Sequence, residues 1–183
     1  NAAADLARRG ADLSADGATA FELLWLKGDM LRVAGVVEEA IQSFESAREM
    51  APEDDMRCRA WLGLADCMRL VDRYDDALAA LDAAQTIAEK NEMTAELSGI
   101  HFRRANIFFP LGRIDACLAE HEEAYRLGQQ AGLRDAEARA LGGLGDAYYQ
   151  RGHMRTAEDN FRRCIALCRE NGLDEIDAAN LNM

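Results

Sequence analysis

Residues 140–164 read ALGGLGDAYYQRGHMRTAEDNFRRC, with three glycines close together near the start. Gly142, Gly143 and Gly145 could form a phosphate-binding loop, or they could be small packing positions inside a helix. The familiar phosphate-binding loops follow a β-strand, and no alternating run of β-branched residues precedes Gly142. The sequence therefore favours a helix whose glycines let a neighbouring helix pack closely.

The spacing that begins at Gly145 recurs through the chain. Small, bulky and small residues follow Gly145 at successive intervals of 12, 4 and 3 residues. Gly28 opens the same series, and two further copies open at Ala65 and Ala105. The opening residues are 37, 40 and 40 positions apart. Self-similarity at such a period indicates an array of repeated helical units.

This pattern resembles the tetratricopeptide repeat, a helix–turn–helix unit of about 34 residues. The bulky and small positions of that family are filled in the last copy by Leu141, Leu144, Gly145, Tyr148, Ala157 and Phe161. His121 stands where the family has an aromatic residue. The resemblance implies an all-α fold, a right-handed superhelical solenoid of antiparallel helix pairs.

The repeats divide the chain into one solenoid domain with four complete units. We expect these units at residues 21–57, 58–97, 98–137 and 138–173. Residues 1–20 are expected to contain the second helix of a truncated preceding repeat, and residues 174–183 the first helix of a truncated following one. Neither end carries an obvious polar cap, so the exposed end faces could self-associate.

A narrower resemblance covers residues 108–124 and 137–172. These stretches are similar to the C-terminal repeat region of bacterial signalling proteins that carry a nucleotide-cyclase domain and an ATPase domain upstream. The resemblance implies a regulatory role within a larger enzyme, although nothing in the present chain would perform cyclase or ATPase chemistry.

Composition excludes several classes of partner. The net charge of −12 argues against nucleic acid, which needs a basic face, and against an anionic membrane surface. No apolar run is long enough to cross a bilayer. The five cysteines lack the paired spacing of a secreted disulfide framework, which indicates buried thiols in a reducing compartment, the cytoplasm.

Catalytic, cofactor and metal sites are not expected. Cys117 and His121, like Cys164 and Cys168, are four residues apart on one helical face and could hold a metal. Two ligands rarely suffice, and Cys117 and Cys164 fall at small packing positions of their repeats. The histidines fall at packing positions or in a turn, away from any evident nucleophile, so we expect no enzyme activity.

The resemblance places a binding groove on the first helix of each repeat. Carried onto this sequence, its lining residues are Trp25, Asp29, Arg32, Leu62, Asp66, Arg69, Phe102, Asn106, Phe109, Arg139, Asp146 and Tyr149. The helical period keeps such positions on one face. Aromatic residues there favour contact with a peptide, whereas Asp29–Arg32 and Asp66–Arg69 could equally be ion pairs on a solvated helix surface.

The sequence thus predicts a non-catalytic scaffold that binds a partner protein or peptide in an acidic groove with an aromatic floor. The alternative is a regulatory segment that contacts another domain of the same polypeptide.

Overall fold

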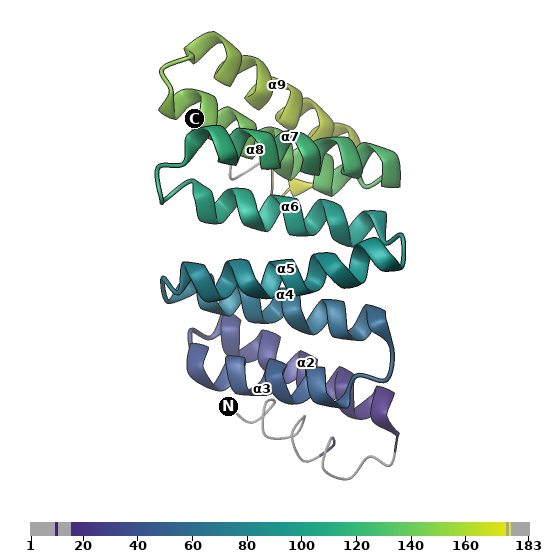
Figure 1. The fold of residues 1–183 in the computed structure, drawn as a ribbon. Helices are drawn as coiled ribbons and strands as arrows, with labels where there is room; N and C mark the ends of the chain where they lie inside the picture. The colour runs from purple at the N-terminus through teal and green to yellow at the C-terminus, as the bar shows by residue number, and fades with distance from the viewer. Residues whose placement is uncertain (1–9, 11–15, 175, 177–183) are drawn as a thin grey trace. The chain divides into compact units, whose positions relative to one another are not determined.

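The computed structural model describes residue 10, residues 16–174 and residue 176. These residues form eight α-helices and no β-strand (Figure 1). In chain order the helices are α2 (Gly17–Val33), α3 (Val37–Met50), α4 (Asp54–Leu70), α5 (Tyr74–Lys90), α6 (Thr94–Phe108), α7 (Ile114–Ala131), α8 (Arg134–Gln150) and α9 (Met154–Asn171). The all-α helical repeat fold predicted from the sequence is therefore confirmed, and the three glycines at 142–145 lie inside α8.

The chain divides into two compact units, each built from two helix pairs. Unit 1 spans Asn1–Asn91 and unit 2 spans Glu92–Met183. In unit 1, α2 packs on α3, α4 packs on α5, and α3 joins the two pairs by packing on α4. Unit 2 repeats this arrangement, with α7 packed on α8 between the pairs α6–α7 and α8–α9.

Each first helix begins four residues before the predicted start of its repeat. The predicted boundaries at 21, 58, 98 and 138 fall inside α2, α4, α6 and α8. These boundaries lie at or one residue after the first buried residue of each helix, which is Ala20, Cys58, Ser98 and Glu137. Asp16 caps the start of α2, where its carboxylate accepts hydrogen bonds from the backbone N–H groups of Ala18 and Thr19.

The predicted half-repeats at the two ends fall largely outside the described residues. Residues 17–20, which the sequence assigned to a preceding helix, belong instead to α2. The rest of that predicted helix, apart from Gly10 and Asp16, and the predicted helix over residues 174–183, apart from 174 and 176, lie outside the described part of the chain.

The predicted small residues are packing positions. A Cβ atom added to Gly145 would lie 2.4 Å from Cε1 of Phe161, and one added to Gly28 would lie 3.0 Å from Cε1 of Phe44. The small residues predicted on the second helices, Ala40, Ala77, Cys117 and Ala157, are all buried. Close approach of paired helices therefore depends on glycine or another small residue facing a ring.

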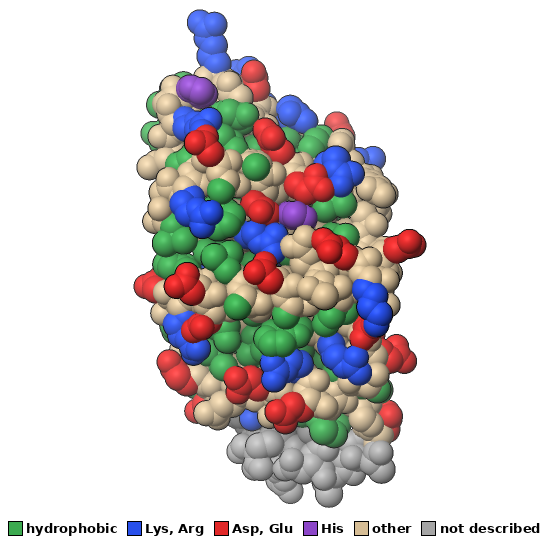
Figure 2. All heavy atoms as spheres, viewed as in Figure 1, with side chains coloured by type: hydrophobic (Ala, Val, Ile, Leu, Met, Phe, Trp, Pro, Cys, Tyr) green, Lys and Arg blue, Asp and Glu red, His purple; other side chains and the backbone are tan. Residues whose placement is uncertain are grey.

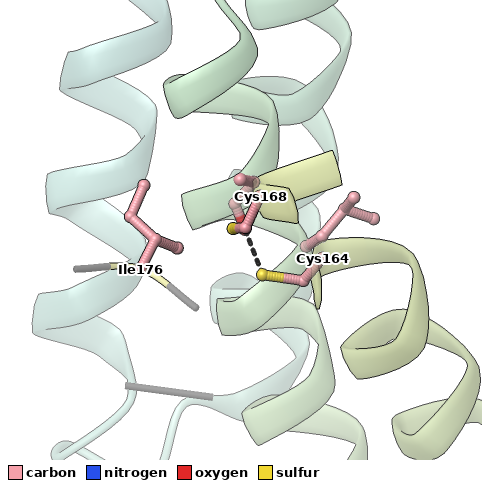
Figure 3. Close-up of a cluster of buried hydrophobic side chains, with 5 residues drawn as sticks. Cys164, Cys168 and Ile176 are labelled. Atoms are coloured by element: carbon pink, nitrogen blue, oxygen red, sulfur yellow. Dashed lines mark hydrogen bonds between the residues drawn. The ribbon is translucent and has the colours of Figure 1, made fainter. Parts of the chain in front are cut away.

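One hydrogen bond recurs between the two helices of a pair. The Cys58 thiol donates to the carbonyl of Ala84, and the Ser98 hydroxyl donates to the carbonyl of Ala124, each across 26 residues. In the last pair the direction is reversed, because the Cys164 thiol donates to the carbonyl of Ala138 at 3.1 Å. Figure 3 shows Cys164 beside Cys168 and Ile176 in the buried cluster of unit 2. The cysteines are buried, as the sequence predicted, and Cys58 and Cys164 also donate hydrogen bonds.

Helix α6 ends early because of Pro110. The other first helices extend to Val33, Leu70 and Gln150, whereas α6 stops at Phe108. Proline has no N–H group to continue the helix. The turn that follows is closed by a bond from the Arg113 N–H to the Phe108 carbonyl at 3.0 Å, and equivalent bonds close the turns after α2, α4 and α8. Phe109 is the C-terminal cap of α6.

Candidate interaction surface

All twelve residues predicted to line a groove keep access to solvent. Six lie on α2 and α4 in unit 1, and the other six lie on α6 and α8 or at the end of α6 in unit 2. We call the first set the α2–α4 face: Trp25, Asp29, Arg32, Leu62, Asp66 and Arg69. The second set is the α6–α8 face: Phe102, Asn106, Phe109, Arg139, Asp146 and Tyr149. None of the twelve is buried, whereas Gly28, Ala65, Ala105 and Gly145, which open the four copies on these helices, all are.

Trp25 is held tightly within unit 1. Its indole N–H donates to the carbonyl of Arg59 at 3.4 Å, and its ring meets the Phe44 ring edge-on at 6.2 Å. The Arg59 guanidinium lies over the Trp25 ring, 4.8 Å from its centre, and is fixed by two hydrogen bonds to Glu22. Contacts among α2, α3 and α4 thus cover much of the surface of the indole ring.

Arg32 forms an ion pair on the α2–α4 face. Its Nη2 lies 2.6 Å from Oδ1 of Asp29, one helical turn away, and its Nε lies 3.1 Å from the same oxygen. This hydrogen bond raises the pKa of Arg32, and the nearby charge of Asp66 acts in the same direction. One guanidinium therefore offsets much of the negative charge that these two aspartates bring to the α2–α4 face.

Asp146 differs from these aspartates because no basic side chain among the described residues pairs with it. Among the described residues its carboxylate makes no side-chain hydrogen bond or ion pair, and partial burial raises its pKa. Cys117 of α7 lies close enough that the Asp146 charge adds to the effect of burial, which together raise the pKa of that thiol to about 11. Asp146 is thus a desolvated, uncompensated charge on the α6–α8 face.

Behind this face lies a buried histidine. The ring of His121, in α7, is 1% exposed, and its Nδ1 has no hydrogen-bond partner. It packs against the ring of Phe102, with 5.6 Å between ring centres, and occupies the space over Gly143. Burial lowers the pKa of His121 to about 4, so the ring is neutral at pH 7.

A charged cluster that the sequence analysis missed lies between α6 and α7. His101 Nδ1 is 2.6 Å from Oε2 of Glu120, and the Arg104 guanidinium is 3.7 Å from the same oxygen. The separation of 19 residues between His101 and Glu120 could have revealed this contact, since residues so separated face each other across two paired helices. Ser43 and Leu24 show the same separation in unit 1, where the hydroxyl donates to the carbonyl.

The described residues contain no group of three or more His, Cys, Asp or Glu residues that could hold a metal ion. Burial raises the pKa of the Cys67 thiol to about 12, which leaves it protonated and poorly nucleophilic at neutral pH. Acidic and basic side chains alternate with hydrophobic ones on the face in view in Figure 2.

A family model for the tetratricopeptide repeat matches residues 96–170, from the first turn of α6 to the last turn of α9. Residues 96–170 are tetratricopeptide repeats. The helix pairs of unit 1 follow the same spacing, since Gly28 and Ala65 open the series that Ala105 and Gly145 repeat in unit 2. No curated protein sequence matches the chain.

Solved structures share the tetratricopeptide-repeat fold at low sequence identity. BtubC from P. vanneervenii is 20% identical, with a TM-score of 0.76 over 92% of this chain and 70% of that one. A Rap protein complexed with Competence and Sporulation Factor is 14% identical, with a TM-score of 0.86 over 97% of this chain and 50% of that one. The Rap conjugation gene regulator of plasmid pLS20, in complex with the Phr* peptide, is 18% identical, with a TM-score of 0.72 over 82% of this chain and 43% of that one.

These likenesses concern the fold of the repeats. The chain spans half or less of the length of the two Rap proteins. No helix among the described residues combines the length and the hydrophobicity that crossing a bilayer would require.

Proposed function

We propose that the chain is a non-catalytic interaction module that binds a peptide or helix of a partner protein on its first-helix faces. The observation that carries this proposal is the solvent access of all twelve predicted contact residues, beside buried packing positions on the same helices. On the α6–α8 face two aromatic rings are exposed, Phe109 at 37% and Tyr149 at 56%. Exposed aromatic residues are enriched where proteins bind one another.

The peptide complexes of structural neighbours support the proposal. One Rap protein is complexed with Competence and Sporulation Factor, and the Rap regulator of pLS20 is in complex with the Phr* peptide. Both are built on a fold that this chain shares. A face made from first helices is suited to an extended ligand, because equivalent residues recur at regular intervals along stacked repeats.

Selection of peptides from a phage-displayed octapeptide library on the immobilised full chain tests the proposal. The wild-type chain should select a consistent set of sequences. The double variant Phe109→Ala/Tyr149→Ala should then bind the selected peptides at least about tenfold more weakly, because exposed aromatic anchors dominate such contacts. Met50→Ala is the matched control, since Met50 is 45% exposed at the end of a second helix. Failure to select peptides, or equal affinity for the double variant, would refute the proposal.

The second candidate is that the bound segment belongs to the same polypeptide. The chain spans only part of the Rap proteins it resembles in fold, which favours a role as one segment of a longer regulatory protein. In the full-length protein, the Phe109→Ala/Tyr149→Ala variant would then change the enzymatic or regulatory activity even when no separate peptide ligand is present. Unchanged output would exclude the intramolecular role.

A further inference from the structure

The two units differ in the charge that they carry at the ninth position of each repeat. This position is Asp29, Asp66, Asn106 and Asp146 in the four successive repeats. Asp29 is held by Arg32 at 2.6 Å, and Asp66 acts on the same guanidinium. Asp146 has no corresponding cation, because the residue three positions later is Tyr149. The α6–α8 face therefore presents a carboxylate where the α2–α4 face presents an ion pair.

No other basic residue of the α6–α8 face reaches Asp146. Arg139, the basic member of this face, lies seven residues earlier on α8, which is about 10 Å along the helix axis. At the end of α8, Arg151 is engaged with Asp115. Partial burial thus removes water from the Asp146 carboxylate without supplying a partner, which is unfavourable in the unbound protein.

We propose that Asp146 accepts the cationic side chain of an arginine or lysine in the bound segment, with the Tyr149 ring beside it as a second contact. This inference rests on the proposed function and names the chemistry of the ligand. Tyr149 lies one helical turn from Asp146, so a single guanidinium or ammonium group can contact the carboxylate and the ring face.

The neighbouring positions suit the same ligand. Asn106 occupies the equivalent place on α6 and makes no side-chain hydrogen bond within the described residues, so its amide is free to bond to the backbone of an extended peptide. Phe109 supplies exposed apolar surface one turn further along. The chain's net charge of −12 also favours the approach of a basic segment over an acidic one.

A double-mutant cycle on peptides selected from the octapeptide library tests this inference. Each selected peptide is synthesised with its arginine or lysine and with norleucine in its place, which keeps the apolar stem and removes the charge. Wild type should bind the norleucine peptide about tenfold or more weakly, as expected for a charge-assisted hydrogen bond. In Asp146→Asn, the affinities for the two peptides should be nearly equal, because the carboxylate that contacts the cation is already gone.

Asp135→Asn is the matched control, since it removes the same charge from an exposed position in the first turn of the same helix. It should keep the full preference for the cationic peptide. Thermal unfolding adds a second readout. Asp146→Asn should raise the melting temperature at neutral pH while it weakens binding, because the unbound carboxylate destabilises the fold. A residue with a purely structural role would not show this combination.

The outcomes separate this inference from the proposed function. Selected peptides without enrichment in arginine or lysine would overturn the role of Asp146 and leave the binding face intact. If replacing arginine or lysine by norleucine weakened binding equally in wild type and in Asp146→Asn, the role of Asp146 would also be overturned. If the wild-type chain selects no peptides, the proposed function fails and the inference fails with it.

Discussion

The ring of Phe161 occupies the space that any side chain on Gly145 would need. A Cβ atom built on Gly145 would lie 2.4 Å from Cε1 and 2.6 Å from Cδ1 of that ring. Phe161 is itself 8% exposed, so it has little room to move away. The contact pairs α8 with α9, and it explains why a residue with poor helix propensity lies in the middle of a helix.

Substitution of Gly145 should therefore destabilise the fold. We expect Gly145→Leu to cost several kcal/mol, at or above the roughly 1–3 kcal/mol of typical core overpacking. Gly145→Ala should cost less. Gly99→Ala is the control, because its added Cβ would meet only the flexible end of Arg103, at 3.1 Å. That variant should be neutral or stabilised by up to about 1 kcal/mol. Chemical denaturation measures all three, and an unchanged midpoint for Gly145→Leu would contradict the packing role.

His121 should make stability depend on pH. Its pKa is lowered from 6.5 to about 4 by burial, which outweighs the opposite effect of Glu120. Between pH 4 and pH 6.5, His121 is protonated in the unfolded chain and neutral in the folded chain. The contribution of His121 to the free energy of unfolding is therefore fully present above about pH 6.5, and it falls by about 3 kcal/mol as the pH drops to 4.

The variant His121→Phe isolates this effect. It removes the titrating group and the buried Nδ1 that lacks a partner. The difference in unfolding free energy between variant and wild type should grow in favour of the variant as the pH falls from about 6.5 to 4. Urea denaturation across this range measures the difference, and carboxylates common to both proteins cancel. A difference independent of pH would show that His121 does not titrate as the structure indicates.

Glu92 holds a backbone conformation that favours glycine. Its φ is 53°, and the positions 40 and 80 residues later are Gly132 and Gly172, with φ of 70° and 66°. Glu92→Gly should stabilise the chain by about 1 kcal/mol by relieving the left-handed conformation. Gly132→Ala should destabilise it by a similar amount for the opposite reason. Thermal melts compare the two, and shifts in the same direction would contradict this account.

Pro110→Ala should lengthen α6. The substitution restores an N–H group that can bond to the carbonyl of Asn106 and lets the helix reach the length of α8. We expect a gain of about 1 kcal/mol in stability, and amide exchange at position 110 should become protected. An unprotected amide at this position would mean that the turn before Gly112, rather than the proline, ends the helix.

The sequence alone determined the repeat and its packing. The intervals of 12, 4 and 3 residues located the small and bulky positions, and the structure then showed that Phe161 packs against Gly145. This was possible because burial of one helix face imposes a local period on residue size and polarity. Each first helix begins four residues before the expected start of its repeat, because the residues that open a helix lie ahead of its first buried positions.

Only the tertiary structure decided which polar groups have partners. Asp29 and Asp146 occupy the same position of the repeat, yet Arg32 holds the first and no residue holds the second among those described. The sequence left open whether the Asp29–Arg32 pair forms. It also missed the contact of His101 with Glu120 on the facing helix. Side-chain pairing depends on distances of a few ångströms between helices and on how much water remains, and a one-dimensional pattern encodes neither.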